Sequence, residues 1–174
     1  MHEIQQALNQ LSGLDLIGLG RAGNLQHLTF GRHRLRERDK PDQLADFALH
    51  LSCPWRLTRD HVIACGQADL ERPSSPFVSD DEYDAGKIGS RWVDLGNAAF
   101  RSYLDQAIVT VLNAEMDGFT GFRLRMSAAV SLDVFPAASK ADHDDLEFWR
   151  LFQPRLDTPH FIVSSQGISR VAET

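Results

Sequence analysis

The residues from Gly18 to Gly23 match the pattern G-x-G-x-x-G, which in dinucleotide-binding proteins lets the backbone approach a pyrophosphate at a helix N-terminus. Such sites also need an acidic residue about 20 positions further on, where Asp39 or Asp42 would serve. However, Gly31 interrupts the helix that this motif requires, and the apolar residues after the motif fit a strand equally well. We therefore interpret the glycines as turn residues that supply positive φ angles, with nucleotide binding as the alternative.

A second group combines two thiols with two imidazoles, a pairing that can supply a nucleophile and its base: His50, Cys53, His61 and Cys65. We predict a hairpin that turns near residues 58–59 and makes Cys65 a diagonal neighbour of Cys53. A catalytic thiol needs a lowered pKa and an exposed position, whereas the residues around both cysteines are apolar. Buried structural thiols are therefore the prediction, and two cysteines are too few for a disulfide framework or a four-ligand zinc site.

A third group is the run Asp142, His143, Asp144 and Asp145, followed by Glu147, which offers ligands for a divalent cation. A metal site needs ligands that converge from several segments, and these residues are adjacent in the chain. We predict instead that Asp142 caps a helix running to Phe152, because acidic residues stabilise the first turn of a helix.

Three tryptophans, Trp55, Trp92 and Trp149, could form an aromatic binding surface, since tryptophan is enriched at the centres of interfaces. They are also large enough to dominate the core of a small domain. We predict core positions for them, with Trp55 the most exposed because Pro54 beside it favours an edge strand.

The charge distribution argues against a dedicated nucleic-acid-binding protein, since the net charge is −6 and the isoelectric point is near 5.6. A basic segment from Arg32 to Lys40 could contact phosphates, although a solvated loop explains it as well. The acidic run from Asp80 to Asp84 could steer the protein toward a basic partner. Nucleic acid is therefore an unlikely partner, and a protein partner remains open.

The firmest structural prediction is a β-hairpin in which apolar and polar residues alternate on both strands. A turn centred on Ala128 gives three cross-strand pairs: Phe122 with Val134, Arg123 with Asp133, and Leu124 with Leu132. The first and last of these pairs are apolar and share one face. The charged pair then lies on the outer face, where it helps to fix the register.

The remaining patterns predict three helices and a series of strands. The helices are expected at 2–11, 97–105 and 142–152, and the other strands at 14–20, 25–31, 44–52, 61–67, 107–116 and 160–164. We expect a single α+β domain over 1–174, built mostly from antiparallel hairpins, with an N-terminal helix and one or two short helices in the C-terminal half. Residues 71–90 are expected to form a mobile acidic loop.

Several short segments of the sequence resemble those of a bacterial protein family of unknown function: Gly20-Arg21-Ala22, 48–56, Val134-Phe135-Pro136 and 148–152. The resemblance covers both halves of the chain but not the loop at 71–90, and it brings no catalytic residues with it. The expected succession of hairpin, helix and final strand is also similar to small immunity proteins of bacterial toxin systems. That likeness implies a role in protein–protein interaction.

From these observations we expect a cytoplasmic bacterial protein that acts by binding another protein, in a form that resembles immunity proteins. No uninterrupted apolar stretch approaches the 18 residues of a membrane span. We assign no catalytic, cofactor-binding or metal-binding residues. The alternative is a small-molecule or nucleotide-binding enzyme that uses the Gly18–Gly23 stretch or the His50, Cys53, His61 and Cys65 group.

Overall fold

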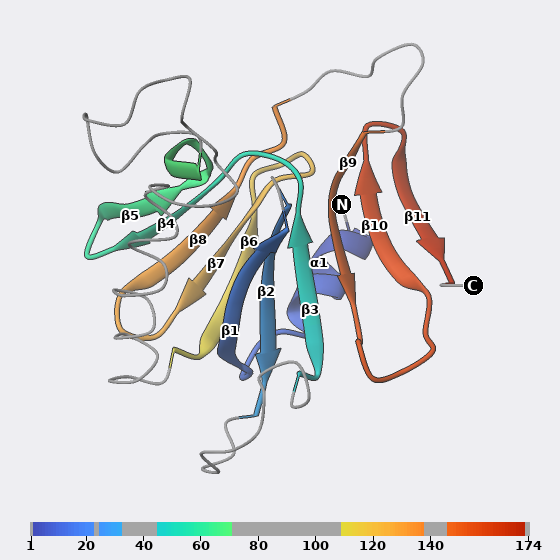
Figure 1. Cartoon of the computed structure of the whole chain (residues 1–174), viewed down its shortest axis with the longest axis horizontal. Coiled ribbons are helices and arrows are strands. Elements are labelled where there is room, and N and C mark those ends of the chain that lie inside the picture. The colour runs from blue at the N-terminus through green and yellow to red at the C-terminus, as the bar shows by residue number, and fades with distance from the viewer. Residues whose placement is uncertain (1, 23–24, 33–44, 71–108, 138–145, 173–174) are drawn as a thin grey trace.

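The structure of the chain is a computed structural model that describes residues 2–22, 25–32, 45–70, 109–137 and 146–172. Its described part consists of two antiparallel sheets and one N-terminal α-helix (Figure 1). The expectation of a mostly antiparallel α+β protein is therefore confirmed. The described residues contain no helix with the length and apolar run that a membrane crossing requires.

The first sheet has six strands in the order β1-β2-β3-β9-β10-β11. Their bounds are β1 Asp15–Ala22, β2 Leu25–Gly31, β3 Phe47–Leu51, β9 Glu147–Phe152, β10 His160–Ser164 and β11 Gly167–Val171. The second sheet has five strands in the order β5-β4-β8-β7-β6. Their bounds are β4 Trp55–Arg59, β5 Val62–Gly66, β6 Val111–Met116, β7 Phe122–Met126 and β8 Val130–Val134. A short 3₁₀ helix, η1 (Gln67–Leu70), follows β5.

The two sheets are joined where the start of β1 meets the segment that leads into β6. The amide of Leu16 donates to the carbonyl of Val109 at 2.8 Å, and the amide of Val111 donates to the carbonyl of Leu14 at 2.8 Å. On the opposite side the chain crosses between the sheets at residues 52–54, between β3 and β4. The inner faces of both sheets therefore enclose a shared core.

The helix α1 (His2–Asn9) contributes an apolar stripe to this core. Ile4, Ala7 and Leu8 recur at the spacing of one helix face and are buried, and Leu11 just beyond the helix is also buried. Glu3 in the first turn complements the positive end of the helix dipole. The same cluster of buried side chains includes residues from both sheets.

The hairpin predicted around Ala128 is confirmed in register. Strands β7 and β8 pair Phe122 with Val134, Arg123 with Asp133 and Leu124 with Leu132. Ala128 and Ala129 both have φ near 56°, the left-handed pair that a two-residue turn of this hand requires. The amide of Val130 donates to the carbonyl of Ser127 at 3.2 Å and closes the turn.

The helix predicted over 142–152 is wrong in its second half, because Glu147–Phe152 is strand β9. Trp149 and Leu151 point into the core, while Arg150 on the other face is half-buried. Apolar residues on both faces of this buried strand produced a spacing that also suits a helix. The short helices expected in the C-terminal half are not present among the described residues; the segments 97–105 and 142–145 lie outside them, as does the loop at 71–90.

The hairpin predicted from 44–52 and 61–67 is also wrong, because its two strands belong to different sheets. β3 is an interior strand that ends before Pro54, and the partner of β5 is the separate strand β4. Their turn lies at Asp60 and His61, which have φ values of 49° and 65°. The final strand β11 was not predicted, whereas the strands expected at 25–31 and 160–164 match β2 and β10.

Candidate functional site: a hollow on the outer face of the five-stranded sheet

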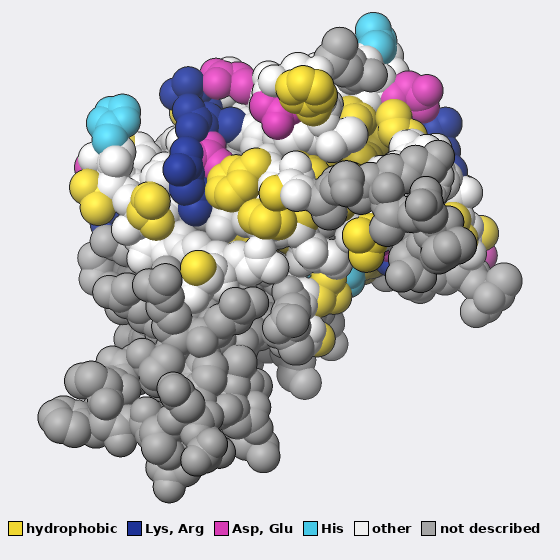
Figure 2. Space-filling view, turned by 90° about the horizontal axis from the view of Figure 1, so that it is seen from above, with side chains coloured by type: hydrophobic (Ala, Val, Ile, Leu, Met, Phe, Trp, Pro, Cys, Tyr) yellow, Lys and Arg dark blue, Asp and Glu magenta, His cyan; other side chains and the backbone are white. Residues whose placement is uncertain are grey.

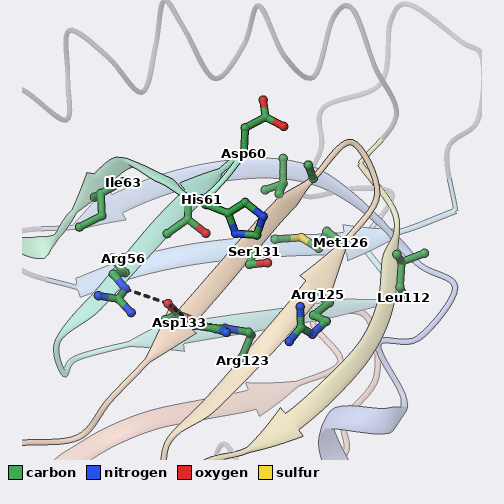
Figure 3. A pocket seen from close by; sticks show the side chains of 13 residues that line it. Arg56, Asp60, His61, Ile63, Leu112, Arg123, Arg125, Met126, Ser131 and Asp133 are labelled. Carbon is green, nitrogen blue, oxygen red and sulfur yellow. Dashed lines mark hydrogen bonds and ion pairs between the residues drawn. The ribbon is translucent and has the colours of Figure 1, made fainter.

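The outer face of the five-stranded sheet contains a hollow of about 690 Å³ (Figure 3). Its floor is low because Thr58 on β4 and Ser131 on β8 are directly opposite one another and have short side chains. Arginines on β4 and β7 rise on either side of them, since residues two apart on a strand share a face. We refer to this space as the hollow; its described lining residues are Arg56, Thr58, Asp60, His61, Ile63, Leu112, Arg123, Arg125, Met126, Ala129, Val130, Ser131 and Asp133.

One wall of the hollow belongs to a row of paired residues that crosses the five-stranded sheet. Arg56 is opposite Asp133, Asp133 is opposite Arg123, and Arg123 is opposite Glu115. At the β5 end of this row stands Gly66, opposite Arg56, which leaves the row without a side chain there. Charges of alternating sign thus adjoin one another along the sheet, as favourable cross-strand pairs do.

Asp133 holds two arginines at once. Its carboxylate accepts a hydrogen bond from Nε of Arg56 at 2.7 Å, and it accepts two from Arg123, through Nε and through Nη2 at 3.0 Å. The Asp133 side chain is 7% exposed, whereas those of Arg56 and Arg123 are 42% and 41% exposed. We call these three residues the Arg–Asp–Arg triad. Its carboxylate is buried and its two guanidinium groups reach the surface.

The triad keeps Asp133 ionised. Burial raises the pKa of this carboxyl, but the hydrogen bonds and charges of Arg123 and Arg56 outweigh burial and leave the pKa below its usual range. The same bond raises the pKa of the Arg123 guanidinium. Two positive charges against one negative charge leave the triad with one uncompensated positive charge.

A second ion pair lies beside the triad. Nε of Arg125 donates to Glu115 at 2.5 Å, and this bond lowers the pKa of the Glu115 carboxyl. Glu115 thereby balances the positive charge of Arg125 on the same face of the sheet. The surplus positive charge of this wall therefore belongs to Arg56 and Arg123.

Exposed apolar residues border the hollow. Ile63 on β5 is 58% exposed and Leu112 on β6 is 61% exposed, while Val62 beside Ile63 is 68% exposed. Among the described strands β5 pairs only with β4, so one of its edges has no described strand beside it. Figure 2 shows basic, acidic and hydrophobic side chains next to one another on one face of the molecule.

The glycine motif does not form a nucleotide loop. Gly18 and Gly20 lie within β1, which pairs antiparallel with β2 where a dinucleotide motif would continue as a helix; Gly23 lies outside the described residues. Gly20 is opposite His27, and a Cβ added to Gly20 would lie 2.1 Å from Nε2 of His27. The glycine therefore makes room for the imidazole ring of its cross-strand neighbour.

We expect the substitution Gly20→Ala to lower the free energy of unfolding by about 1–3 kcal/mol, the usual range for overpacking. The added methyl group displaces the ring of His27, on the neighbouring strand β2, from its place against Gly20. Urea denaturation measures the effect, and the double variant Gly20→Ala/His27→Ala is the control that should recover most of the loss. Equal destabilisation in both variants would show that the ring contact is not the reason for glycine.

The structure does not bring the four residues His50, Cys53, His61 and Cys65 together as a catalytic group. Cys65 is opposite Leu57 on the inner face of its sheet, so the predicted diagonal contact across a shared hairpin is wrong. Both cysteines are buried and neither forms a disulfide, and burial raises the pKa of the Cys53 thiol to about 12. Their expected structural role fits this environment, because a protonated thiol is a poor nucleophile.

His50 lies on the outer face of the other sheet, between His27 and Arg150 on the neighbouring strands. Burial, followed by the charges of His27 and Arg150, lowers the pKa of His50 to about 4. The imidazole is neutral at neutral pH and packs edge-on against Phe152, with ring centroids 4.8 Å apart. Phe152 in turn stacks on His160, so this row serves as aromatic packing. His61, by contrast, lies at the β4–β5 turn and lines the hollow.

The remaining candidates fall into the core or outside the described part. Trp55 and Trp149 are 3% and 0% exposed, which confirms their core positions, while Trp92 lies outside the described residues. Glu147 forms an ion pair with Arg150 at 2.5 Å, and no group of three metal-ligating side chains occurs within the described ranges. The runs 80–84 and 142–145, like residues 33–40 of the basic segment, lie outside those ranges.

Sequence reasoning missed most of the hollow. The pairing of Arg123 with Asp133 was predicted, and Arg125 follows on the same face by alternation. Arg56 and Thr58 were missed because their strand was taken as part of a turn. The available signal was the alternation of Trp55 and Leu57 with Arg56 and Thr58, the mark of a half-buried strand.

Comparisons with known proteins returned no matching family model, no similar curated protein and no similar solved structure. The hollow and its neighbouring strand edge are therefore interpreted from their own chemistry.

Proposed function

We propose that the protein acts by binding a partner protein through the exposed apolar side chains of β5 and the hollow beside them. The observation that carries this proposal is the exposure of two adjacent apolar residues on β5, Val62 at 68% and Ile63 at 58%, next to the hollow. Exposed apolar side chains beside a cavity offer area to bury against a partner.

The choice of β5 over β11 rests on its surroundings. Both strands end a sheet, and Ile168 and Val171 on β11 are also exposed. Of these two strands only β5 borders the hollow, which Ile63 and Arg56 line from the same side. Arginine and aliphatic groups that adjoin a cavity are typical of the energetic centre of an interface.

Neutralisation of a toxin in the bacterial cytoplasm is one form that such binding can take, as the resemblance to immunity proteins implies. The rival proposal of a nucleotide-binding enzyme has less support, because Gly18 and Gly20 lie inside an antiparallel strand. A cysteine-dependent enzyme has less support because the Cys53 thiol has a pKa raised to about 12.

The test compares lysine substitutions at the two sheet edges. We expect Ile63→Lys to weaken capture of the partner from a bacterial lysate by at least about tenfold, because a charge at the apolar centre of an interface is costly to bury. The matched control Ile168→Lys places the same charge on β11 and should leave capture unchanged. Quantitative mass spectrometry of the retained proteins gives the readout, and hydrogen exchange with the purified partner should show added protection of the β5 amides.

If the Ile63→Lys variant still captures the partner, or if only the Ile168→Lys variant fails to capture it, the binding surface does not lie at β5. Both lysines replace exposed residues, so circular dichroism should show the same fold for both variants.

A further inference from the structure

We infer that the hollow binds a small organic phosphate ester, whose phosphoryl group contacts the arginines of the wall and whose organic part lies between Ile63 and Leu112. The inference goes beyond the proposed function and does not depend on it, because a small ligand needs no partner protein. It starts from the size of the hollow. A volume of about 690 Å³ lies within the range of about 300–1,000 Å³ that small-molecule sites occupy.

Positive charge exceeds negative charge where the hollow meets its wall. Three arginines of β4 and β7 line the hollow there, and the carboxylate among them is Asp133: Arg56, Arg123 and Arg125. Figure 3 shows the other lining carboxylate, Asp60, at the opposite end of the hollow, and Asp60 forms an ion pair with Arg59 at 3.6 Å. Glu115 balances Arg125 from β6 but does not itself line the hollow. The wall therefore favours an anionic ligand.

The arginines of the wall keep N–H groups for such a ligand. Arg56 donates to Asp133 through Nε alone. Arg125 likewise donates to Glu115 through Nε alone, so the Nη groups of both arginines lack a hydrogen bond to any described residue. Arg123 commits Nε and Nη2 to Asp133 and keeps Nη1. Planar guanidinium groups form paired hydrogen bonds with phosphate oxygens, and hydrogen bonds between charged partners are about twice as strong as neutral ones.

Asp133 fixes two of these arginines before any ligand arrives. Its side chain is 7% exposed and accepts hydrogen bonds from Nε of both Arg56 and Arg123, so a buried group orients the two guanidinium planes. Arg56 also lies over the ring of Phe135, with its Cζ 5.5 Å from the ring centroid. An arginine that is already held in place loses less side-chain freedom on binding than a solvated one.

The hydroxyl groups at the floor favour a tetrahedral phosphoryl group over a planar carboxylate. Thr58 lies two residues from Arg56 on β4, and Ser131 lies opposite both Thr58 and Arg125. These hydroxyls can donate from the floor while the guanidinium groups donate from the wall. A phosphate monoester has three terminal oxygens and a charge of about −1.5 to −2, whereas a carboxylate has two oxygens and a single negative charge. Donors that come from two directions therefore match the phosphoryl group better.

Exposed apolar side chains flank the floor on both sides. Ile63 on β5 is opposite Thr58 and is 58% exposed, and Leu112 on β6 is 61% exposed. Figure 3 shows these two residues on opposite sides of the hollow. Covering them with an apolar group is favourable, because it removes apolar surface from water. The expected ligand therefore joins its phosphoryl group to an aromatic or aliphatic group.

Isothermal titration calorimetry with phenyl phosphate, benzoate and inorganic phosphate tests this inference. Benzoate keeps the ring and replaces the phosphoryl group by a carboxylate, and inorganic phosphate lacks the ring. We expect phenyl phosphate to bind the wild-type chain at least about tenfold more tightly than either of the other probes. Equal affinity for phenyl phosphate and benzoate would overturn recognition of the phosphoryl group. Equal affinity for phenyl phosphate and inorganic phosphate would overturn the organic part of the ligand, and no measurable binding would overturn the site.

Substitutions in the hollow show whether phenyl phosphate binds there. Arg123→Gln should weaken its binding at least about tenfold, and Ser131→Ala about fivefold, the effect of one lost neutral hydrogen bond. Arg56→Lys keeps the charge balance around Asp133 but loses the planar guanidinium, so it should also weaken binding while the fold persists. The matched control Arg155→Gln removes an arginine that lies outside the hollow and should retain full affinity. Unchanged affinity in the three hollow variants, or an equal loss in the control, would overturn the assignment to the hollow.

A capped phosphoserine distinguishes a small ester from a phosphorylated partner protein, because it carries the same phosphoryl group without the aromatic ring. Weaker binding than that of phenyl phosphate would support the small ester, and equal or tighter binding would overturn it in favour of a phosphorylated side chain. None of these titrations includes a partner protein. Failure of the Ile63→Lys test therefore overturns the proposed function alone, and failure of the titrations overturns this inference alone.

Discussion

Replacing Trp149 with alanine is expected to lower the free energy of unfolding by about 3–5 kcal/mol, the range observed for truncating a large buried aromatic residue. Trp149 is fully buried on β9 and connects the two sheets. Its ring meets Phe122 of the five-stranded sheet edge-to-face with centroids 5.1 Å apart, and its Nε1 donates to the carbonyl of Thr120 at 3.0 Å. Alanine would remove the packing and the hydrogen bond together.

Urea denaturation followed by circular dichroism measures this effect as a shift of the transition midpoint at constant slope. The control Trp149→Phe keeps an aromatic ring against Phe122 but loses the bond to Thr120, and it should cost only about 1–2 kcal/mol. A loss below about 1 kcal/mol for the alanine variant would contradict the role of Trp149 as the link between the sheets. A single cooperative transition in the wild-type protein would support the predicted single domain.

The surroundings of Trp149 also explain why its strand could not be recognised from the sequence. On β9 the inward residues Trp149 and Leu151 are apolar, and Phe152 on the other face stacks with His160. Apolar residues on both faces remove the alternation that identifies a strand, and the remaining spacing suits a helix. The β7–β8 hairpin was predictable because only one of its faces is buried, so that Leu124 and Arg125 alternate in polarity.

The hollow was only half predictable for a related reason. A hairpin is local, so the pairing of Arg123 with Asp133 followed from the turn at Ala128. The second arginine comes from β4, which pairs with β8 across more than seventy positions of the chain. Pairing between distant strands depends on the packing of the whole core, which local patterns of polarity do not encode. The triad therefore became visible only in the folded chain.

Replacing Asp133 with alanine is expected to lower the free energy of unfolding by about 2–4 kcal/mol, because removing one partner of a buried ion pair leaves the others uncompensated. Arg56 and Arg123 would face each other across β8 without the carboxylate between them. In contrast, the triple variant Arg56→Met/Asp133→Leu/Arg123→Met should recover stability to within about 1 kcal/mol of the wild type, as apolar replacements of buried ion pairs commonly do. Chemical denaturation of the wild type and the two variants at neutral pH measures these differences.

The pH dependence of a further variant, Asp133→Asn, separates charge from packing. The pKa of Asp133 is lower in the folded protein than in the unfolded chain, where an aspartate titrates near about 3.9. The stabilisation that ionised Asp133 provides is therefore complete above about pH 5 and is lost as the pH falls through the folded-state pKa. Asp133→Asn keeps the shape without the charge, so its stability deficit should be constant from about pH 5 to 8 and shrink in more acidic solution. A deficit that does not change with pH would assign the effect to packing.

Together these variants decide whether the fold requires the triad. If the apolar triple variant is as stable as the wild type, the fold does not require the charges of Arg56, Asp133 and Arg123. If the triple variant is instead destabilised as strongly as Asp133→Ala, the triad is a structural cross-link between β4, β8 and β7.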